Sequence, residues 1–234
     1  MTNEPDTTSG SLRATLIDYG ETGNPEDLDR AISLADGFTQ DQGFRRLDPG
    51  DAAVIWSLGG AARIHRSRLG EHPRDLDDAV TWCSRALDTA LDSDSNRPSY
   101  ASNLAMILVE RYERDLSRAD LDEALALFEW AVPEIESAGR QASIGLHNHG
   151  LALLELYQAD HDIAVLDRAI EVLRKASADT TQPKAVTGGY LNSLGQALRA
   201  KRKRHPTRRP SMRRCTPCTA HKSGHRGQTI MSPH

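Results

Sequence analysis

The sequence predicts an all-α fold, a right-handed α-solenoid of stacked antiparallel helix pairs, and three observations support this prediction. Aromatic residues make up only 5% of the chain, while alanine, leucine, aspartate and arginine dominate, a composition that favours helices over strands. Two sequence marks recur at a regular interval along the chain. Turn-forming glycine and proline residues separate the segments that carry these marks.

The first mark is a Leu-Asp pair in the strings EDLDRAISLA, RDLDDAVTWC, ADLDEALALF and AVLDRAIEVL. Its leucines are Leu28, Leu76, Leu121 and Leu166, so the steps between them are 48, 45 and 45 residues. The second mark lies in the strings SLGGAARIH, NLAMILVERY, NHGLALLELY and SLGQALRAK. The second residue of each string serves as its anchor, and the steps between anchors are 46, 45 and 45 residues. These anchors are Leu58, Leu104, His149 and Leu194. Two marks in phase indicate a repeat with a period of about 45 residues.

The segment that follows each Leu-Asp pair keeps small or apolar residues at i, i+4 and i+7, which places them on one helix face. The sets are Ala31, Ala35, Phe38; Ala79, Cys83, Ala86; Ala124, Phe128, Ala131; and Ala169, Leu173, Ala176. Small residues there allow a neighbouring helix to approach closely. The carboxylates around each Leu-Asp pair favour a helix N-terminus, and we expect them to form a solvated face with a capping role.

The first segment of each unit is long enough for a helix of about five turns. The connections carry the helix breakers Gly23, Pro25, Gly70, Pro73, Pro98 and Pro183. Each unit is therefore predicted to be a helix, a turn and a second helix. One such hairpin cannot bury its own apolar stripe, so neighbouring hairpins must stack on one another.

The order of Asn-Leu, a following aromatic residue, and then Leu-Asp-x-Ala-x3-(Phe/Leu/Cys)-x2-Ala resembles the tetratricopeptide repeat (TPR) over roughly residues 10 to 200. The period of 45 departs from the usual 34 residues, which implies a longer first helix and turn. This long form is similar to arrays in high-GC bacteria and fungi that stand beside caspase-like CHAT peptidase domains. The CHAT domain itself is not expected here, because no strand-rich segment carries a His and Cys dyad.

The predicted organisation is a disordered N-terminus over 1–9, a repeat domain over 10–200 with about four hairpins and one extra helix, and a basic disordered tail over 201–234. Up to Leu198 there are 33 acidic residues against 18 Lys and Arg, giving −15. From Arg199 onward there are 11 Lys and Arg and no acidic residue, giving +11. A charge break of this kind is typical of a basic tail or of a boundary between unrelated segments.

A fifth Leu-Asp mark would fall near residue 211, where the chain reads RPSMRRCTP instead. A frame shift after about Ala200 would explain this basic stretch, and it is our preferred interpretation. A zinc site is the first rival, through Cys215, Cys218, His221 and His225. Only two residues separate its ligand pairs, so it is a weak candidate and no bound metal is expected. Nucleic-acid binding through KRKRHPTRRP is the other rival, and the absence of nearby aromatic residues disfavours it.

The chain shows no secretory leader, no apolar run long enough to span a membrane and no disulfide framework among its three cysteines. A cytoplasmic protein that does not enter membranes is therefore expected. Cys83 lies in an apolar helical pattern and is predicted to pack in the core. No phosphate-binding loop, nucleophile elbow or zinc-protease motif is present, so we expect no enzyme activity and no cofactor. His147 and His149 are predicted to be exposed or capping residues, and His161 to lie in a turn.

Binding of a partner is therefore the function that the sequence leaves open. The TPR resemblance implies that the first helices line a concave groove, which the position before each anchor often faces. The groove candidates are Ser57, Asn103, Glu110, Asn148, Glu155 and Ser193. An array with a charge of −15 favours a basic protein or peptide partner. The expected function is a non-catalytic protein-interaction scaffold.

The alternatives are a regulatory or sensor fragment of a TPR-CHAT peptidase system, and a nucleic-acid or zinc-binding adaptor that works through the tail. The helix around Leu194 and Leu198 lacks a following hairpin. A homodimer through this uncapped helix is therefore one expectation.

Overall fold

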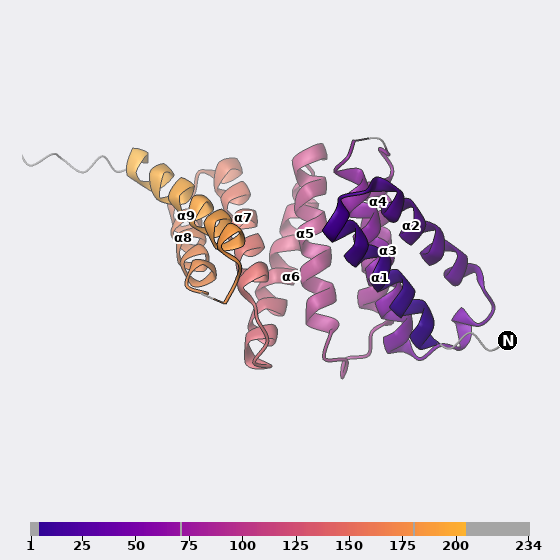
Figure 1. Cartoon of the computed structure of the whole chain (residues 1–234). Helices are drawn as coiled ribbons and strands as arrows, with labels where there is room; N and C mark the ends of the chain where they lie inside the picture. The colour runs from indigo at the N-terminus through magenta and orange to yellow at the C-terminus, as the bar shows by residue number, and fades with distance from the viewer. Residues whose placement is uncertain (1–4, 71, 180, 205–234) are drawn as a thin grey trace, which may run out of the picture.

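The structure, a computed structural model, describes residues 5–70, 72–179 and 181–204. In these residues the chain forms helices joined by short connections, and no strand is present. The helices follow one another as packed pairs from α1 at one end of the array to α9 at the other (Figure 1). The predicted all-α solenoid of stacked helix pairs is confirmed.

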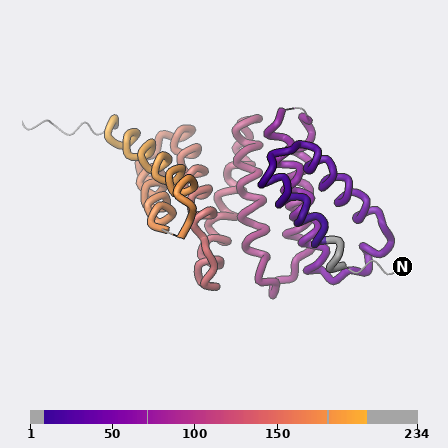
Figure 2. The backbone as a smooth tube through the Cα atoms, in the orientation of Figure 1, coloured from indigo at the N-terminus to yellow at the C-terminus, as the bar shows by residue number. Residues whose placement is uncertain are grey.

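The helices are α1 (Pro5–Thr22), α2 (Pro25–Gln40), α3 (Pro49–Ser67), α4 (Asp75–Thr89), α5 (Arg97–Asp115), α6 (Arg118–Ser137), α7 (Ser143–Asp160), α8 (Ile163–Ser177) and α9 (Lys184–Arg204), with a short 3-10 turn η1 (Phe44–Arg46). Within a unit, α3 packs on α4, α5 on α6 and α7 on α8. Between units, each second helix also packs on the first helix of the next unit, so the backbone advances in one direction (Figure 2).

Local sequence fixes where these helices begin and end. Asn24 and Asp48 each accept a hydrogen bond from a backbone N–H of the first turn and precede a proline that starts the helix. Leu116 and His161 end α5 and α7 in the left-handed conformation, with φ values of 56° and 57°. These two residues lie 45 positions apart, so successive hairpins turn in the same way, and His161 is in a turn as predicted.

The four Leu-Asp pairs occupy equivalent places in successive layers. Leu28, Leu76, Leu121 and Leu166 are all buried. The aspartate that follows each leucine is exposed and forms an ion pair. Asp29 pairs with Arg66 and Asp77 with Arg114, each from the first helix of the next unit. The predicted register of the first mark is therefore confirmed.

The small and apolar stripe of the second helices forms the core, as predicted. Its members are buried, except that Phe38 is half-buried. Two first-helix glycines allow close packing against this stripe. A Cβ on Gly60 would lie 2.4 Å from Cys83 Sγ, and one on Gly150 would lie 2.6 Å from Leu173 Cγ. The predicted core position of Cys83 is confirmed, and burial raises the pKa of its thiol to about 12.

In three of the four Leu-Asp runs, the carboxylate before the leucine (Asp27, Asp75 or Asp120) was wrongly predicted to be solvated. Asp75 and Asp120, each placed directly before the leucine, are buried. Arg66 Nε lies 2.6 Å from Asp75 Oδ2, and Arg111 Nε lies 2.8 Å from Asp120 Oδ2, so each pair joins the two helices of one hairpin. Buried aspartates need such partners, because a buried charge without one is costly.

The α7–α8 hairpin replaces this ion pair with apolar residues. One period after Arg111 and Asp120 stand Leu156 and Val165, and both pack against the main core cluster. The same position in the hairpin is therefore filled either by a paired charge or by two aliphatic side chains.

The ends of the described chain differ from the expected boundaries. Helix α1 begins at Pro5, inside the segment 1–9 that was expected to be disordered, and α9 continues to Arg204, past the expected end of the repeat domain at 200. Residues 205–234 lie outside the described residues, and with them the expected tail disorder, the frame shift and the candidate ligands Cys215, Cys218, His221 and His225. None of the described helices has the length and hydropathy that a membrane span requires.

Candidate functional site

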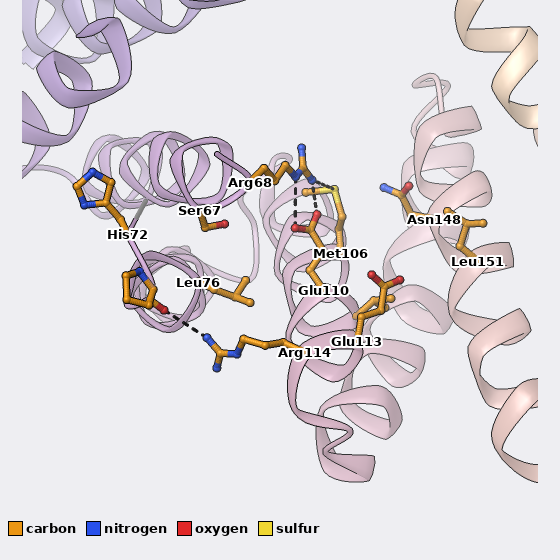
Figure 3. Close-up of a pocket in the computed structure, with 12 residues that line it drawn as sticks. Ser67, Arg68, His72, Leu76, Met106, Glu110, Glu113, Arg114, Asn148 and Leu151 are labelled. Atoms are coloured by element: carbon orange, nitrogen blue, oxygen red, sulfur yellow. Dashed lines mark hydrogen bonds and ion pairs between the residues drawn. The ribbon is translucent and has the colours of Figure 1, made fainter. Parts of the chain in front are cut away.

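A cavity of about 530 Å³ opens where the α3–α4 turn meets α5 and α7 (Figure 3). Its walls are formed by Ser67, Arg68, His72, Pro73, Leu76, Met106, Val109, Glu110, Glu113, Arg114, Asn148 and Leu151. The lining residues come from three successive units of the array. Because first helices of neighbouring units lie beside one another, residues that are far apart in the sequence meet in this cavity.

The cavity combines an apolar wall with carboxylates. Leu76, Met106, Val109 and Leu151 supply aliphatic surface from α4, α5 and α7. Glu110 and Glu113 stand three residues apart on α5, which places both on one face of that helix. A partner that buries apolar surface here would also meet negative charge.

Glu110 already has a cationic partner within the chain. Arg68, at the end of α3, forms an ion pair with it, and Arg68 Nε donates to Glu110 Oε2 at 3.3 Å. The dashed lines in Figure 3 show this pair at one side of the cavity. The charge of Glu110 is thereby balanced.

Glu113 has no ion-pair partner among the residues described. Partial burial raises the pKa of its carboxyl, and the charges of Glu155 and Glu110 raise it further. Figure 3 shows its side chain directed towards Asn148 and Leu151 of α7. An uncompensated carboxylate that solvent and ligands can reach is a favourable position for a cation supplied by a ligand.

Arg114 lines the same cavity without balancing Glu113. Its Nη2 contacts Asp77 Oδ1 at 2.8 Å and Asp115 Oδ2 at 2.6 Å, and its Nη1 reaches Pro73 O at 3.5 Å. These contacts hold the guanidinium at the α4 side of the cavity. The negative charge on the α7 side therefore remains.

A comparison of the units explains this charge. Counting 45 residues from Arg68 reaches Glu113, and counting 45 from Glu110 reaches Glu155. The attractive pair Arg68–Glu110 between α3 and α5 is thus replaced by the two carboxylates of Glu113 and Glu155 between α5 and α7. The position that holds an arginine at one junction holds a glutamate at the next.

The predicted groove residues do not form one set. Glu110 and Asn148 line the cavity, and Glu155 acts on it electrostatically through Glu113. Asn103 is exposed on α5 and Ser57 half-buried on α3, and neither lines the cavity. Ser193 is buried between α7 and α9, where its hydroxyl lies 3.0 Å from His147 Nε2 and donates to Gly189 O at 3.3 Å.

Ser57 was aligned one residue out of register. Gly60 meets Cys83 and Gly150 meets Leu173, so these equivalent glycines lie two periods of 45 residues apart. By this register Asn103 corresponds to Leu58, and Ser57 corresponds to Ser102. The matching Leu58 and Leu104 anchors, 46 residues apart in the sequence, suggested the wrong alignment.

Glu113 was missed by the sequence analysis, although a signal for it exists. It stands one helical turn after Glu110, on the same face. A search for charged residues one turn from each groove candidate, over both neighbouring units, would have found it.

His147 and His149 are neither exposed nor capping residues, so that prediction was wrong. His149 is buried and stacks on Phe128, with ring centroids 5.6 Å apart, and burial lowers its pKa to about 4. His147 is half-buried beside Tyr190, with centroids 4.5 Å apart, and burial lowers its pKa as well. Both rings fill space between successive units, which a polar residue type alone does not reveal.

The part of the chain that the structure describes contains no group of three or more His, Cys, Asp or Glu side chains arranged to hold a metal ion. The candidate zinc ligands lie beyond Arg204, outside this part.

Comparisons with known proteins add little to this geometry. No protein-family model and no curated protein matches the chain. It is similar to the crystal structure of BtubC (BKLC) from P. vanneervenii, at 16% identity over 98% of this chain and 97% of that chain, with a TM-score of 0.46. It is also similar to the de novo designed helical repeat protein DHR64, at 15% identity over 85% of this chain and 93% of that one, with a TM-score of 0.34. The assignment to helical-repeat arrays therefore rests on the helices described above.

Proposed function

We propose that this chain is a non-catalytic, TPR-like interaction scaffold that binds a basic peptide or protein segment in the cavity between the α3–α4 turn, α5 and α7. The observation that carries the proposal is the like-charge pair Glu113 and Glu155 at a position where the preceding junction has the ion pair Arg68–Glu110. A lysine or arginine side chain of the partner would take the place that Arg68 fills at that junction.

The shape and chemistry of the cavity support the same partner. Its volume of about 530 Å³ accommodates a few side chains, and its wall offers Met106, Val109 and Leu151 beside the carboxylates. A segment with a basic residue next to aliphatic ones would satisfy both parts of the site. The acidic charge of the array up to Leu198 would also steer such a segment towards it.

A charge reversal tests this proposal. Peptides selected on the wild-type chain from a random library are expected to carry Lys or Arg beside Leu, Ile or Met. Glu113→Arg recreates the pairing of Arg68 with Glu110, now towards Glu155, and should lower the affinity of the selected peptides at least tenfold, about 1.4 kcal/mol. The affinity would be measured by fluorescence anisotropy.

Glu123→Arg is the matched control, because Glu123 is exposed on α6 and does not line the cavity. This control changes the net charge equally and should leave affinity within about twofold. Peptides without basic residues, or equal losses in both variants, would contradict the proposed site.

The role as a regulatory or sensor fragment of a peptidase system would use the same surface, so the same peptides would guide a search for that partner. The adaptor role depends on the tail after Arg204, outside the described residues. Removal of residues 205–234 separates it from the scaffold role, which should retain peptide binding.

A further inference from the structure

Helix α9 exposes the face that a second helix covers in the preceding unit. Leu191 and Leu198 are 54% and 39% exposed, whereas Leu146 and Leu153, one period earlier on α7, are 8% and 1% exposed. On its other side, α9 buries Ala197 completely against α8. Figure 1 shows α9 beside α7 and α8, at the end of the array opposite to α1 and α2. In the described residues, nothing covers Leu191 and Leu198.

A notch for a side chain lies between these two leucines. The equivalent glycines Gly60 and Gly150 are in contact with Cys83 and Leu173 from the second helix of their own unit. At Gly195 an added Cβ would meet only Arg199 Nη1, at 3.5 Å. The backbone of α9 therefore offers the same close approach, and the notch is open.

The ion pairs of α9 also differ from those of α3, the first helix of an earlier unit. Arg66 binds two aspartates, Asp29 of the preceding unit and Asp75 at the start of its own second helix. Lys201 occupies the same position in α9 and contacts Asp167 of the preceding unit at 2.7 Å. Among the described residues, no second aspartate pairs with Lys201 in the way that Asp75 pairs with Arg66. Helix α9 contains no acidic residue and ends in Lys201, Arg202, Lys203 and Arg204, so its C-terminal end is strongly cationic.

From these features we propose that α9 binds an amphipathic α-helix of another protein. That helix carries a carboxylate in its first turn and an apolar residue four positions after a small one. Its carboxylate meets Lys201, its apolar side chain enters the notch at Gly195, and its stripe covers Leu191 and Leu198. This surface is separate from the cavity, so the inference goes beyond the proposed function.

Two other occupants fit the surface poorly. The chain's own segment 205–234 contains no aspartate or glutamate, so it has no carboxylate side chain to place beside Lys201. A second copy that joined α9 to α9 would bring two helices together that both lack acidic residues and end in basic ones. The charge of α9 favours an acidic helix from a different protein.

The probe is a fluorescein-labelled synthetic peptide with the sequence of residues 117–137. This segment comprises α6 and its N-cap Ser117, and Asp120 and Phe128 stand where the inferred helix needs its carboxylate and its apolar residue. Titration with the full chain, followed by fluorescence anisotropy, should show saturable binding. Asp120→Lys in the peptide should weaken binding at least fivefold.

Leu191→Glu in the full chain should weaken binding at least tenfold. Ile17→Glu is the matched control, because Ile17 is also 54% exposed but lies on α1, and it should have no effect. Glu113→Gln should also have no effect, which separates this surface from the cavity. Circular dichroism would verify that each variant keeps its helix content.

Three results would overturn the proposal. The first is no binding up to about 1 mM peptide, a free energy of only about −4 kcal/mol. The second is binding that appears only after residues 205–234 are removed, because the tail is then the occupant. The third is a dimer in light scattering that Leu191→Glu dissociates, because a second copy then covers α9. Saturable binding lost with Leu191→Glu and kept with Ile17→Glu supports it.

Discussion

Arg111 and Asp120 form a two-point ion pair that joins α5 to α6, with Nε–Oδ2 at 2.8 Å and Nη2–Oδ1 at 2.7 Å. Asp120 is buried, and its guanidinium partner is largely covered. The hydrogen bond to Asp120 raises the pKa of Arg111, so the guanidinium stays charged. In the next hairpin, Leu156 of α7 and Val165 of α8 occupy the equivalent positions and pack in the core without charge.

This comparison predicts strong coupling between the two residues. Asp120→Val alone should lower the free energy of unfolding by about 3 kcal/mol, because it leaves Arg111 without its main partner. The double variant Arg111→Leu with Asp120→Val copies the α7–α8 hairpin and should cost less than the single variant. Urea denaturation followed by circular dichroism measures both.

Asp160→Asn provides the control for that cycle, since the pair Arg118–Asp160 is exposed and should contribute at most about 1 kcal/mol. Additive losses in the double variant would show that the pair does not act as a unit.

Replacing Gly150 with alanine should destabilise the chain, whereas the same change at Gly195 should not. The new Cβ at 150 would lie 2.6 Å from Leu173, so repacking should cost about 1–3 kcal/mol. At 195 there is room, so the better helix propensity of alanine should be neutral or stabilise by up to about 1 kcal/mol. Thermal melts of the two variants test this, and equal melting temperatures would be inconsistent with the packing described.

The buried ring of His149 predicts a loss of stability in mild acid. Its pKa is about 4 in the folded chain against an ordinary 6.5, so between these values the unfolded chain binds a proton that the folded chain does not. Stability from this residue is complete above pH 6.5 and falls towards pH 4, by up to about 1.4 kcal/mol per pH unit.

His149→Leu should reduce that slope, because leucine occupies the equivalent positions 104 and 194. His161→Asn is the control, since His161 is exposed and asparagine tolerates its left-handed conformation. Urea midpoints at several pH values give the slopes. A slope unchanged by His149→Leu would assign the acid sensitivity to other groups.

Glu113→Arg should stabilise the free chain as well as block its cavity. The change replaces a repulsion with a pairing of the kind that Arg68 makes with Glu110, and the gain should be about 0.5–1 kcal/mol at low salt. Added salt should reduce the gain, because the site is open to solvent. A melting temperature lower than that of the wild type would contradict the pairing with Glu155.

Cys83 should resist alkylation in the native chain. Its thiol is buried and its pKa is raised to about 12, so almost no thiolate is present at neutral pH. In a variant with Cys215→Ser and Cys218→Ser, iodoacetamide should modify Cys83 only after urea is added. Mass spectrometry measures the modification, and rapid labelling without urea would show that α3 and α4 separate readily.

The sequence was sufficient for the repeat, because Leu28, Leu76, Leu121 and Leu166 are buried for the same reason in every unit and therefore recur in type. The sequence was not sufficient to predict the cavity. Glu113 has a special environment only because Glu155, 42 residues later, lies near it, and a single helix pattern does not contain that information. Likewise, Asp120 looks like a capping carboxylate until Arg111 is seen beside it.

The prediction that His147 and His149 are exposed or capping residues failed for a related reason. The residue type at 149 suggested exposure, while its place in the repeat, between Leu104 and Leu194, indicated the core. Position within the repeat was the better guide, and the same reasoning places Lys201 in register with Arg66 and Arg111.

The 45-residue interval also makes the chain easy to edit in whole units. Helices pack mainly on neighbours within two places along the chain, and the hydrogen bond between His147 and Ser193 spans only 46 residues. Cutting out residues 97–141 would join the end of the α3–α4 hairpin to the start of the α7–α8 hairpin. Such a shortened protein would retain its layers but lose α5, and with it both Glu110 and Glu113. Removing this one module would therefore change the length of the array and its recognition surface together.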